Sequence, residues 1–156
     1  MKKTNYLLQA AIIAAIYAAL TIFLAPFSYG VAQIRASEAL TVLPFFTPAA
    51  IPGLFIGCLI ANIMSPVGIL DIVIGSLSTL VAAVLSYYLR HKPILVPLPP
   101  VIINGITVGW MLVAIYGVPM PLWTSMASVA LGQFIACYVI GYPLLRYLRK
   151  YAHVFF

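Results

Sequence analysis

Four apolar stretches without a charged residue fill most of this chain and define the elements that it predicts. A membrane-spanning helix needs about 20 consecutive apolar residues. Only the third stretch has the length of one such helix, so the others must contain breaks or loops. The four stretches are residues 4–34, 39–70, 72–89 and 93–145.

Proline-rich segments supply the breaks. The sequence TPAAIP at residues 47–52 divides the second stretch into two short spans, because proline lacks a backbone donor and restricts the residue before it. The sequence GVPMP at residues 117–121 interrupts the last stretch in the same way. The first loop is expected to be the long one. The predicted helices are residues 6–26, 37–47, 50–64, 68–90, 95–116 and 122–146.

Composition supports a membrane-embedded fold. Of the 156 residues, 65% are hydrophobic and 6% are charged, and the mean hydropathy is +1.15. A soluble domain carries about a quarter charged residues. We therefore predict an all-α integral membrane protein, a compact bundle of six transmembrane helices that forms a single domain over residues 1–156. The first apolar helix is expected to stay in the membrane and not to be cleaved as a secretory signal.

The cations predict the orientation of this bundle. They stand in three groups, before the first predicted helix, after the fourth and after the sixth, and these positions share one side of a six-span chain. The positive-inside rule makes that side cytoplasmic, so both termini are expected there. The formal net charge of +6 is then a topology signal, and no nucleic-acid partner is predicted. The three groups are Lys2 and Lys3, Arg90 and Lys92, and Arg146, Arg149 and Lys150.

The chain has only two acidic residues, and both are predicted at the outer side of the membrane. Glu38 lies at the start of the second helix and Asp71 at the start of the fourth. An ionised carboxylate costs roughly 3 kcal/mol or more at the bilayer centre, so two acids at one depth indicate a binding task. Arg35 in the first loop and Asn62 near the outer end of the third helix are candidates for the same site.

A structural interpretation of these residues is also open. Ser37 can cap the second helix, with Glu38 in its first turn and Arg35 neutralising that acid. Asp71 can equally be a first-turn carboxylate of the fourth helix. The polar residues of the other helices can hydrogen-bond between helices as readily as to a ligand. These residues are Asn62, Asn104 and Gln133.

Small residues give the first predicted helix a flat face. Two sets of alanines run along it at four-residue spacing, one position apart, and such a face lets another helix approach closely. Packing inside the bundle and docking of a partner are both open, although the doubled pattern favours docking. The two sets are Ala10, Ala14 and Ala18, and Ala11, Ala15 and Ala19.

Three segments carry a resemblance to a known family. They read AQIRASEALTVLP at residues 32–44, TPAAIPGLFIG at residues 47–57 and GILDIVIGS at residues 68–76. Together they resemble the QueT family, which are substrate-binding S components of energy-coupling factor (ECF) transporters associated with uptake of queuosine precursors. The resemblance covers essentially the whole chain, including its length and helix count.

The resemblance implies the partners and the setting of this chain. S components have six helices, an alanine face on the first helix that docks on a membrane coupling protein, and a first loop that helps close the pocket. The implied partners are that coupling protein and two ATPase subunits, since this chain has no GxxxxGK[ST] phosphate loop of its own. The implied setting is a prokaryotic cell membrane, and no cofactor is implied.

The implied substrate gives the two acids a chemical role. A 7-deazaguanine presents a ring N–H beside an exocyclic amine, and one carboxylate can accept both, while the 7-aminomethyl form adds an ammonium for a second carboxylate. Glu38 and Asp71 are expected to divide these roles, with Arg35 beside them in the first loop. Side-chain amides and a stacking aromatic are expected to complete the site. The candidates are Asn62, Asn104 and Gln133, and Trp110, Phe45, Phe46 or Tyr29.

Other classes of function receive less support from the sequence. His91 and His153 are predicted by the cytoplasmic end, far from the acids, so neither a metal site nor an enzyme is expected. Cys58 and Cys137 form no CxxC motif and are expected to be packed thiols. A stand-alone proton-coupled transporter of a small organic cation is the main alternative, because a membrane carboxylate can exchange a proton for a cation. A purely structural subunit is a third possibility.

Overall fold

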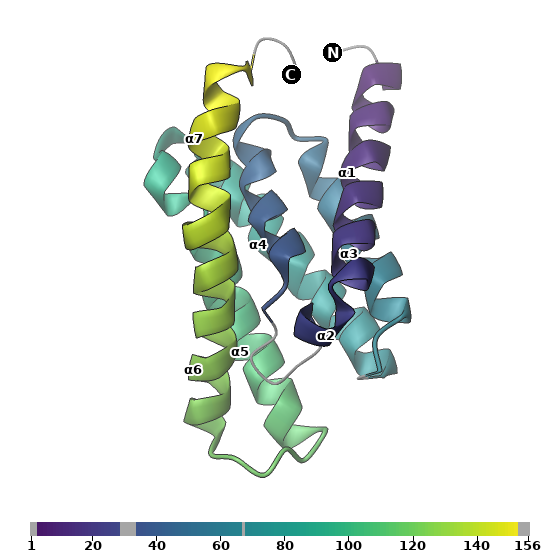
Figure 1. Cartoon of the computed structure of the whole chain (residues 1–156), viewed down its shortest axis with the longest axis vertical. Helices are drawn as coiled ribbons and strands as arrows, with labels where there is room; N and C mark the ends of the chain where they lie inside the picture. The colour runs from purple at the N-terminus through teal and green to yellow at the C-terminus, as the bar shows by residue number, and fades with distance from the viewer. Residues whose placement is uncertain (1–2, 29–33, 67, 153–156) are drawn as a thin grey trace.

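The computed structural model describes residues 3–28, 34–66 and 68–152, and every regular element in these residues is helical (Figure 1). The α-helices are α1 (Lys3–Phe23), α2 (Ala25–Ser28), α3 (Ala50–Ile63), α4 (Ser76–Tyr88), α5 (Leu98–Ala114), α6 (Leu122–Phe134) and α7 (Tyr142–Lys150). The 3-10 segments are η1 (Ala36–Phe45), η3 (Leu89–His91) and η4 (Pro93–Leu95). The π segments are η2 (Asp71–Gly75) and η5 (Ile135–Gly141).

Within the described residues, four continuous helical stretches are long and apolar enough to cross a membrane. They are Thr4–Phe23, Asp71–His91, Pro93–Ala114 and Leu122–Lys150, and α3 is a shorter apolar helix. The all-helical fold class is thus confirmed for the described residues, which include several helices that are long and apolar enough to span a membrane. The count of six spans and the cytoplasmic position of the termini stay predictions.

The predicted breaks lie where the prolines are. α3 begins at Ala50, between the two prolines of the first break, and α6 begins directly after Pro121. In the second break Gly117 has a φ angle of +64°, a left-handed conformation that glycine adopts without steric cost. The breaks therefore follow from local backbone chemistry.

The second predicted helix differs in type from the expectation. Residues 37–47 were expected to form an ordinary span, whereas the structure has the 3-10 helix η1 there. Pro44 lies inside this helix and has no N–H to donate. Thr41 Oγ1 donates to the carbonyl oxygen of Glu38 at 2.6 Å, which gives that carbonyl a partner three residues away. Both features favour the tighter 3-10 winding over a regular α-helix.

η1 lies in the centre of the fold. It packs against α1, α3, α4, η5 and α7, and Figure 1 shows it passing between α1 and the long α6–α7 rod. Most of its side chains are buried, including the polar ones. Polar groups placed here are surrounded by protein, and any ligand bound to them would be enclosed by several helices.

The two alanine sets of α1 separate in the structure. Ala10, Ala14 and Ala18 are buried, whereas Ala11, Ala15 and Ala19 are exposed. The buried set faces α3 at two glycines: a Cβ added to Gly53 would lie 2.8 Å from the Ala10 carbonyl oxygen, and one added to Gly57 would lie 2.8 Å from that of Ala14. The buried set therefore packs within the bundle, and the exposed set remains accessible for a partner.

The cationic segments gather at one end of the molecule. The start of α1, the end of α7 and the η3–η4 segment lie at the same end in Figure 1, with the loop between α5 and α6 at the opposite end. Arg90, Lys92, Arg146, Arg149 and Lys150 belong to the cationic end. This arrangement is the one that the charge pattern predicts.

Candidate functional site

Three segments near the candidate residues, η1, η2 and η5, depart from α-helical geometry. Glu38 belongs to η1 and Asp71 is the first residue of η2. η5 packs against η1, where the Cys137 thiol lies 3.6 Å from the carbonyl oxygen of Glu38. Short π segments inside helices occur frequently at functional sites. Both acids of the chain thus lie in or beside irregular helix.

Glu38 is buried and is held from α1. Only 1% of its surface is exposed. The hydroxyl of Tyr17, a fully buried side chain, donates to Glu38 Oε1 at 2.5 Å. Glu38 Oε2 is buried and has no hydrogen-bond partner among the described residues. One oxygen of this carboxylate is therefore fixed by the protein, and the other can accept a donor.

Ser37 does not cap the second helix. η1 begins after Arg35, which occupies the N-cap position without a side-chain capping bond. The Ser37 Oγ atom lies 2.6 Å from Thr21 Oγ1 and so links η1 to α1. The capping interpretation of Ser37 is wrong because the helix begins two residues earlier than that interpretation requires.

Arg35 is a buried cation that joins three segments. Only 4% of its surface is exposed. Its Nη2 atom lies 3.3 Å from Asp71 Oδ2, its Nη1 donates to Asn62 Oδ1 at 3.0 Å, and its Nε donates to the Ser28 carbonyl at 3.3 Å. A buried charge is costly unless it is paired and hydrogen-bonded. The sequence interpretation paired Arg35 with Glu38, whereas its ion pair in the structure is with Asp71.

Asn62 connects α3 to the π segment that carries Asp71. Its Nδ2 donates to the Asp71 backbone oxygen at 3.0 Å and lies 3.4 Å from Ser76 Oγ. Gly75 makes room for this arrangement: a Cβ there would lie 3.0 Å from both Asn62 Nδ2 and Asp71 Oδ1. Asn62 therefore makes the interhelical hydrogen bonds that the structural interpretation expects. A ligand contact by Asn62 stays a prediction.

Three buried oxygen acceptors in this region have no hydrogen-bond partner among the described residues. They are Glu38 Oε2, Asp71 Oδ1 and Asn104 Oδ1. Asn104 is 3% exposed and lies on α5, which packs against both η2 and η5. Leaving a buried acceptor unsatisfied costs about 1–3 kcal/mol. A molecule that satisfied these atoms would have to supply N–H or O–H donors.

The remaining candidate ligand-binding residues differ in how deeply they are buried in the protein. Gln133 is buried near the end of α6, and its Oε1 lies 3.8 Å from the Cys137 thiol. Trp110 is 45% exposed on α5. Phe45 and Phe46 pack edge to face at the end of η1, with ring centres 4.8 Å apart, and Tyr29 lies outside the described residues. Stacking of any of these aromatics on a ligand stays a prediction.

The described part of the chain offers no cluster of metal ligands. No three His, Cys, Asp or Glu side chains converge there in a way that could hold a metal ion. Cys58 and Cys137 are buried free thiols, as the sequence predicts. Cys58 lies 3.4 Å from Thr79 Oγ1. The site is thus a set of carboxylates, amides and one guanidinium.

Comparison with known proteins gives two matches. The model of the family described as "QueT transporter" matches residues 7–150. The protein named "Queuosine precursor transporter QueT" from Lactococcus lactis subsp. cremoris (strain MG1363) is 42% identical over 81 residues. That alignment covers 51% of this chain and 47% of the relative, so the match spans about half the length of each. No solved structure matches the chain.

Proposed function

Because the chain belongs to the QueT transporter family, we propose that it is the substrate-specificity component of an ECF-type importer of queuosine precursors. Its substrate in this proposal is a 7-deazaguanine, taken from the extracellular side. The name of the Lactococcus lactis relative supports this class of substrate. The observation that carries the proposal is the presence of three buried acceptor oxygens that have no hydrogen-bond partner in the described part of the chain.

Hydrogen-bond chemistry relates these oxygens to the proposed ligand. The ring N–H and the exocyclic amine of a 7-deazaguanine are donors, and an ionised carboxylate is an acceptor only. Glu38 and Asp71 each have one carboxylate oxygen bound by a protein side chain and one with no hydrogen-bond partner within residues 3–28, 34–66 and 68–152. In the proposal one acid accepts the base and the other accepts the ammonium of the aminomethyl form. Asn104 Oδ1 accepts a further donor.

The first prediction is that the purified chain binds a 7-deazaguanine without nucleotide or partner. Thermal-shift and calorimetric titrations with guanine, 7-cyano-7-deazaguanine, 7-aminomethyl-7-deazaguanine and queuine measure this directly. A ligand at about 100 times its Kd stabilises the folded state by roughly 2.7 kcal/mol, so at least one compound is expected to raise Tm clearly. Adenine, whose donor pattern differs, serves as the control. Absence of any response to all four compounds would contradict the substrate assignment.

Transport assays separate this proposal from its alternative. The S-component proposal requires ATP, the coupling protein and the two ATPase subunits for uptake into proteoliposomes. A stand-alone proton-coupled transporter of a small organic cation would take up substrate by itself when a proton gradient is imposed. Gradient-driven uptake by the chain alone would therefore overturn the proposed mechanism, even if the same ligand bound.

The second prediction concerns docking on the coupling protein, which we assign to the exposed set Ala11, Ala15 and Ala19. Replacing Ala15 with leucine is expected to leave ligand binding and Tm nearly unchanged, because this side chain is exposed. ATP-driven uptake by the assembled complex should fall, since a bulky residue keeps two helix backbones apart. Binding by the isolated chain and uptake by the complex are the two measurements.

Ala14 provides a matched control one position away. It is buried against α3, and overpacking such a contact costs about 1–3 kcal/mol. Replacing Ala14 with leucine should therefore lower Tm in the isolated chain. If the Ala15 variant lost ligand binding, or if it supported normal uptake, the exposed alanines would not be the docking face.

A further inference from the structure

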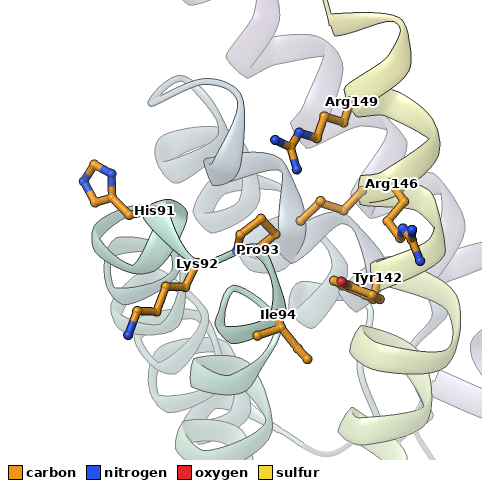
Figure 2. Close-up of a pocket in the computed structure, with 8 residues that line it drawn as sticks. His91, Lys92, Pro93, Ile94, Tyr142, Arg146 and Arg149 are labelled. Carbon is orange, nitrogen blue, oxygen red and sulfur yellow. The ribbon is translucent and has the colours of Figure 1, made fainter.

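The cationic end of the bundle contains a hollow that the proposed transport role does not use. It has a volume of about 490 Å³ and lies between the η3–η4 segment and α7 (Figure 2). Cationic and apolar side chains line it together. We call it the cationic hollow, and its residues are His91, Lys92, Pro93, Ile94, Tyr142, Leu145, Arg146 and Arg149.

Two arginines give the hollow its charge. Arg146 and Arg149 are exposed and stand three residues apart on α7, a spacing that places them on neighbouring turns of one face. In Figure 2 the Arg149 side chain extends from α7 toward the η3–η4 segment, and Lys92 stands on the opposite side. The only two acidic residues of the chain, Glu38 and Asp71, do not line this hollow. The hollow therefore presents positive charge that attracts an anion.

An apolar seam continues from the hollow toward the middle of the bundle, first between η5 and η4 and then between α5 and α6. Tyr138 in η5 donates its hydroxyl to the Ile94 carbonyl at 3.0 Å, and the Phe134 ring stacks on Tyr138 with ring centres 5.0 Å apart. Beyond this pair, α5 and α6 form a second hollow of about 300 Å³ that apolar residues line. These residues are Val101, Ile102, Gly105, Ile106, Met126, Ala127 and Ala130.

The order of these features follows the order of groups in a phospholipid. The cationic hollow lies at the end of the bundle, and the pair of aromatic rings comes next. The apolar groove between α5 and α6 follows, closer to the middle of the bundle. Phosphate, interface and acyl chain occur in that order in a bilayer leaflet, with aromatic side chains at the level of the interface. Basic pockets between transmembrane helices bind anionic lipid headgroups.

We propose that this seam binds one anionic phospholipid. Its phosphate contacts the guanidinium groups of Arg146 and Arg149, which match phosphate oxygens in a two-pronged geometry. Lys92 adds charge at the rim of the hollow, and one acyl chain lies along the groove between α5 and α6. This proposal does not depend on the identity of the transported substrate.

The test compares two double variants that remove the same charge. The double variant Arg146→Gln with Arg149→Gln removes both arginines that line the hollow. Arg90→Gln with Lys150→Gln is the control, because these two cations do not line the hollow. Arg90 lies 4.1 Å from the ring centre of Tyr87, and Lys150 Nζ lies 5.7 Å from that of Tyr151. Both pairs lower the net charge of the chain by two.

Binding is measured on the full chain in detergent, by native mass spectrometry and by thermal shift, with phosphatidylglycerol and phosphatidylcholine of equal chain length. Phosphatidylglycerol is expected to bind and raise Tm, and phosphatidylcholine to do so much less. A basic residue near an anionic lipid surface contributes about 1 kcal/mol, so losing both arginines should weaken phosphatidylglycerol binding by about 30-fold. The control pair should weaken it much less.

Any of three other results would overturn the proposal of a phospholipid site. Equal losses in the two double variants would indicate diffuse attraction by the whole cationic end. Equal binding of the two lipids would exclude recognition of the anionic headgroup. Glycerol phosphate that raised Tm as strongly as the lipid would indicate a site for a free phosphate. If the double variant fails to fold, Arg149→Gln compared with its neighbour Lys150→Gln gives the same test.

Discussion

Replacing Asp71 with asparagine is expected to lower the free energy of unfolding by about 3–5 kcal/mol, which is the usual cost of breaking a buried ion pair. Arg35 and Asp71 are almost completely buried, with 3.3 Å between Nη2 and Oδ2. The Arg35 guanidinium would keep its bonds to the neutral oxygens of Asn62 and Ser28, but these carry no compensating charge. Thermal unfolding in a fixed detergent measures the effect, and Tm should fall by roughly 10 °C or more.

A double variant tests the cause of that loss. Removing one partner of a buried ion pair leaves an uncompensated buried charge, whereas replacing both partners leaves none. Arg35→Gln combined with Asp71→Asn should therefore be more stable than Asp71→Asn alone. A Tm for the single variant close to that of the unmodified chain would contradict the prediction. A double variant as unstable as the single one would assign the loss to hydrogen bonds and not to charge.

The sequence predicted those features of the fold that depend on neighbouring residues. Each break between spans follows from prolines or glycines in the break itself, as at residues 47–52 and 117–121. The length of an apolar run alone located the stretch Asp71–His91. Such features need no knowledge of which helix packs on which, because the membrane imposes the same length and polarity on every span.

The sequence pattern did not predict that the second helix is a 3-10 helix. Residues 37–47 carry the apolar pattern of a span, and that pattern does not distinguish α from 3-10 winding. The bond from Thr41 to Glu38 and the position of Pro44 inside the helix describe the difference once the structure is known. The packing of η1 against α1, α3, α4, η5 and α7 is a tertiary feature that the local apolar pattern does not contain.

The other features of the site depend on contacts between residues that are far apart in the sequence. The sequence placed Arg35 beside Glu38 because they are three residues apart, whereas its ion-pair partner, Asp71, lies 36 residues away. The two alanine sets of α1 were equivalent in the sequence. Gly53 and Gly57 of α3 distinguish them by their close approach to Ala10 and Ala14. Side-chain orientation relative to other helices is therefore the information that an apolar pattern lacks.

Replacing Glu38 with glutamine is expected to weaken ligand binding by about 1.5–3 kcal/mol, the contribution of a hydrogen bond to a charged group, which corresponds to about tenfold to 150-fold in Kd. Glutamine keeps the shape of the side chain and an oxygen that can accept from Tyr17. At the position of Oε2, which has no partner among the described residues, it would place an N–H₂ group. That group donates and would face the donors of the ligand.

Stability and affinity must be measured together for this variant. If Glu38 serves the fold alone, the substitution changes Tm and leaves Kd for a bound ligand unchanged. If it serves the ligand, calorimetry shows the loss of affinity while Tm without ligand changes little. Ser37→Ala is the matched control, because Ser37 contacts Thr21 of α1 and is expected to leave Kd unchanged.

The choice of ligand then assigns the role of the acid. If Glu38 accepts the ring N–H and the exocyclic amine, Glu38→Gln weakens the 7-cyano and the 7-aminomethyl compounds alike, because both share that part of the base. If Glu38 pairs with the ammonium, the loss is much larger for the aminomethyl compound, since a charge-assisted bond disappears only there. A Kd unchanged for both compounds, with binding intact, would place Glu38 outside the ligand site and leave its bond to Tyr17 as its function.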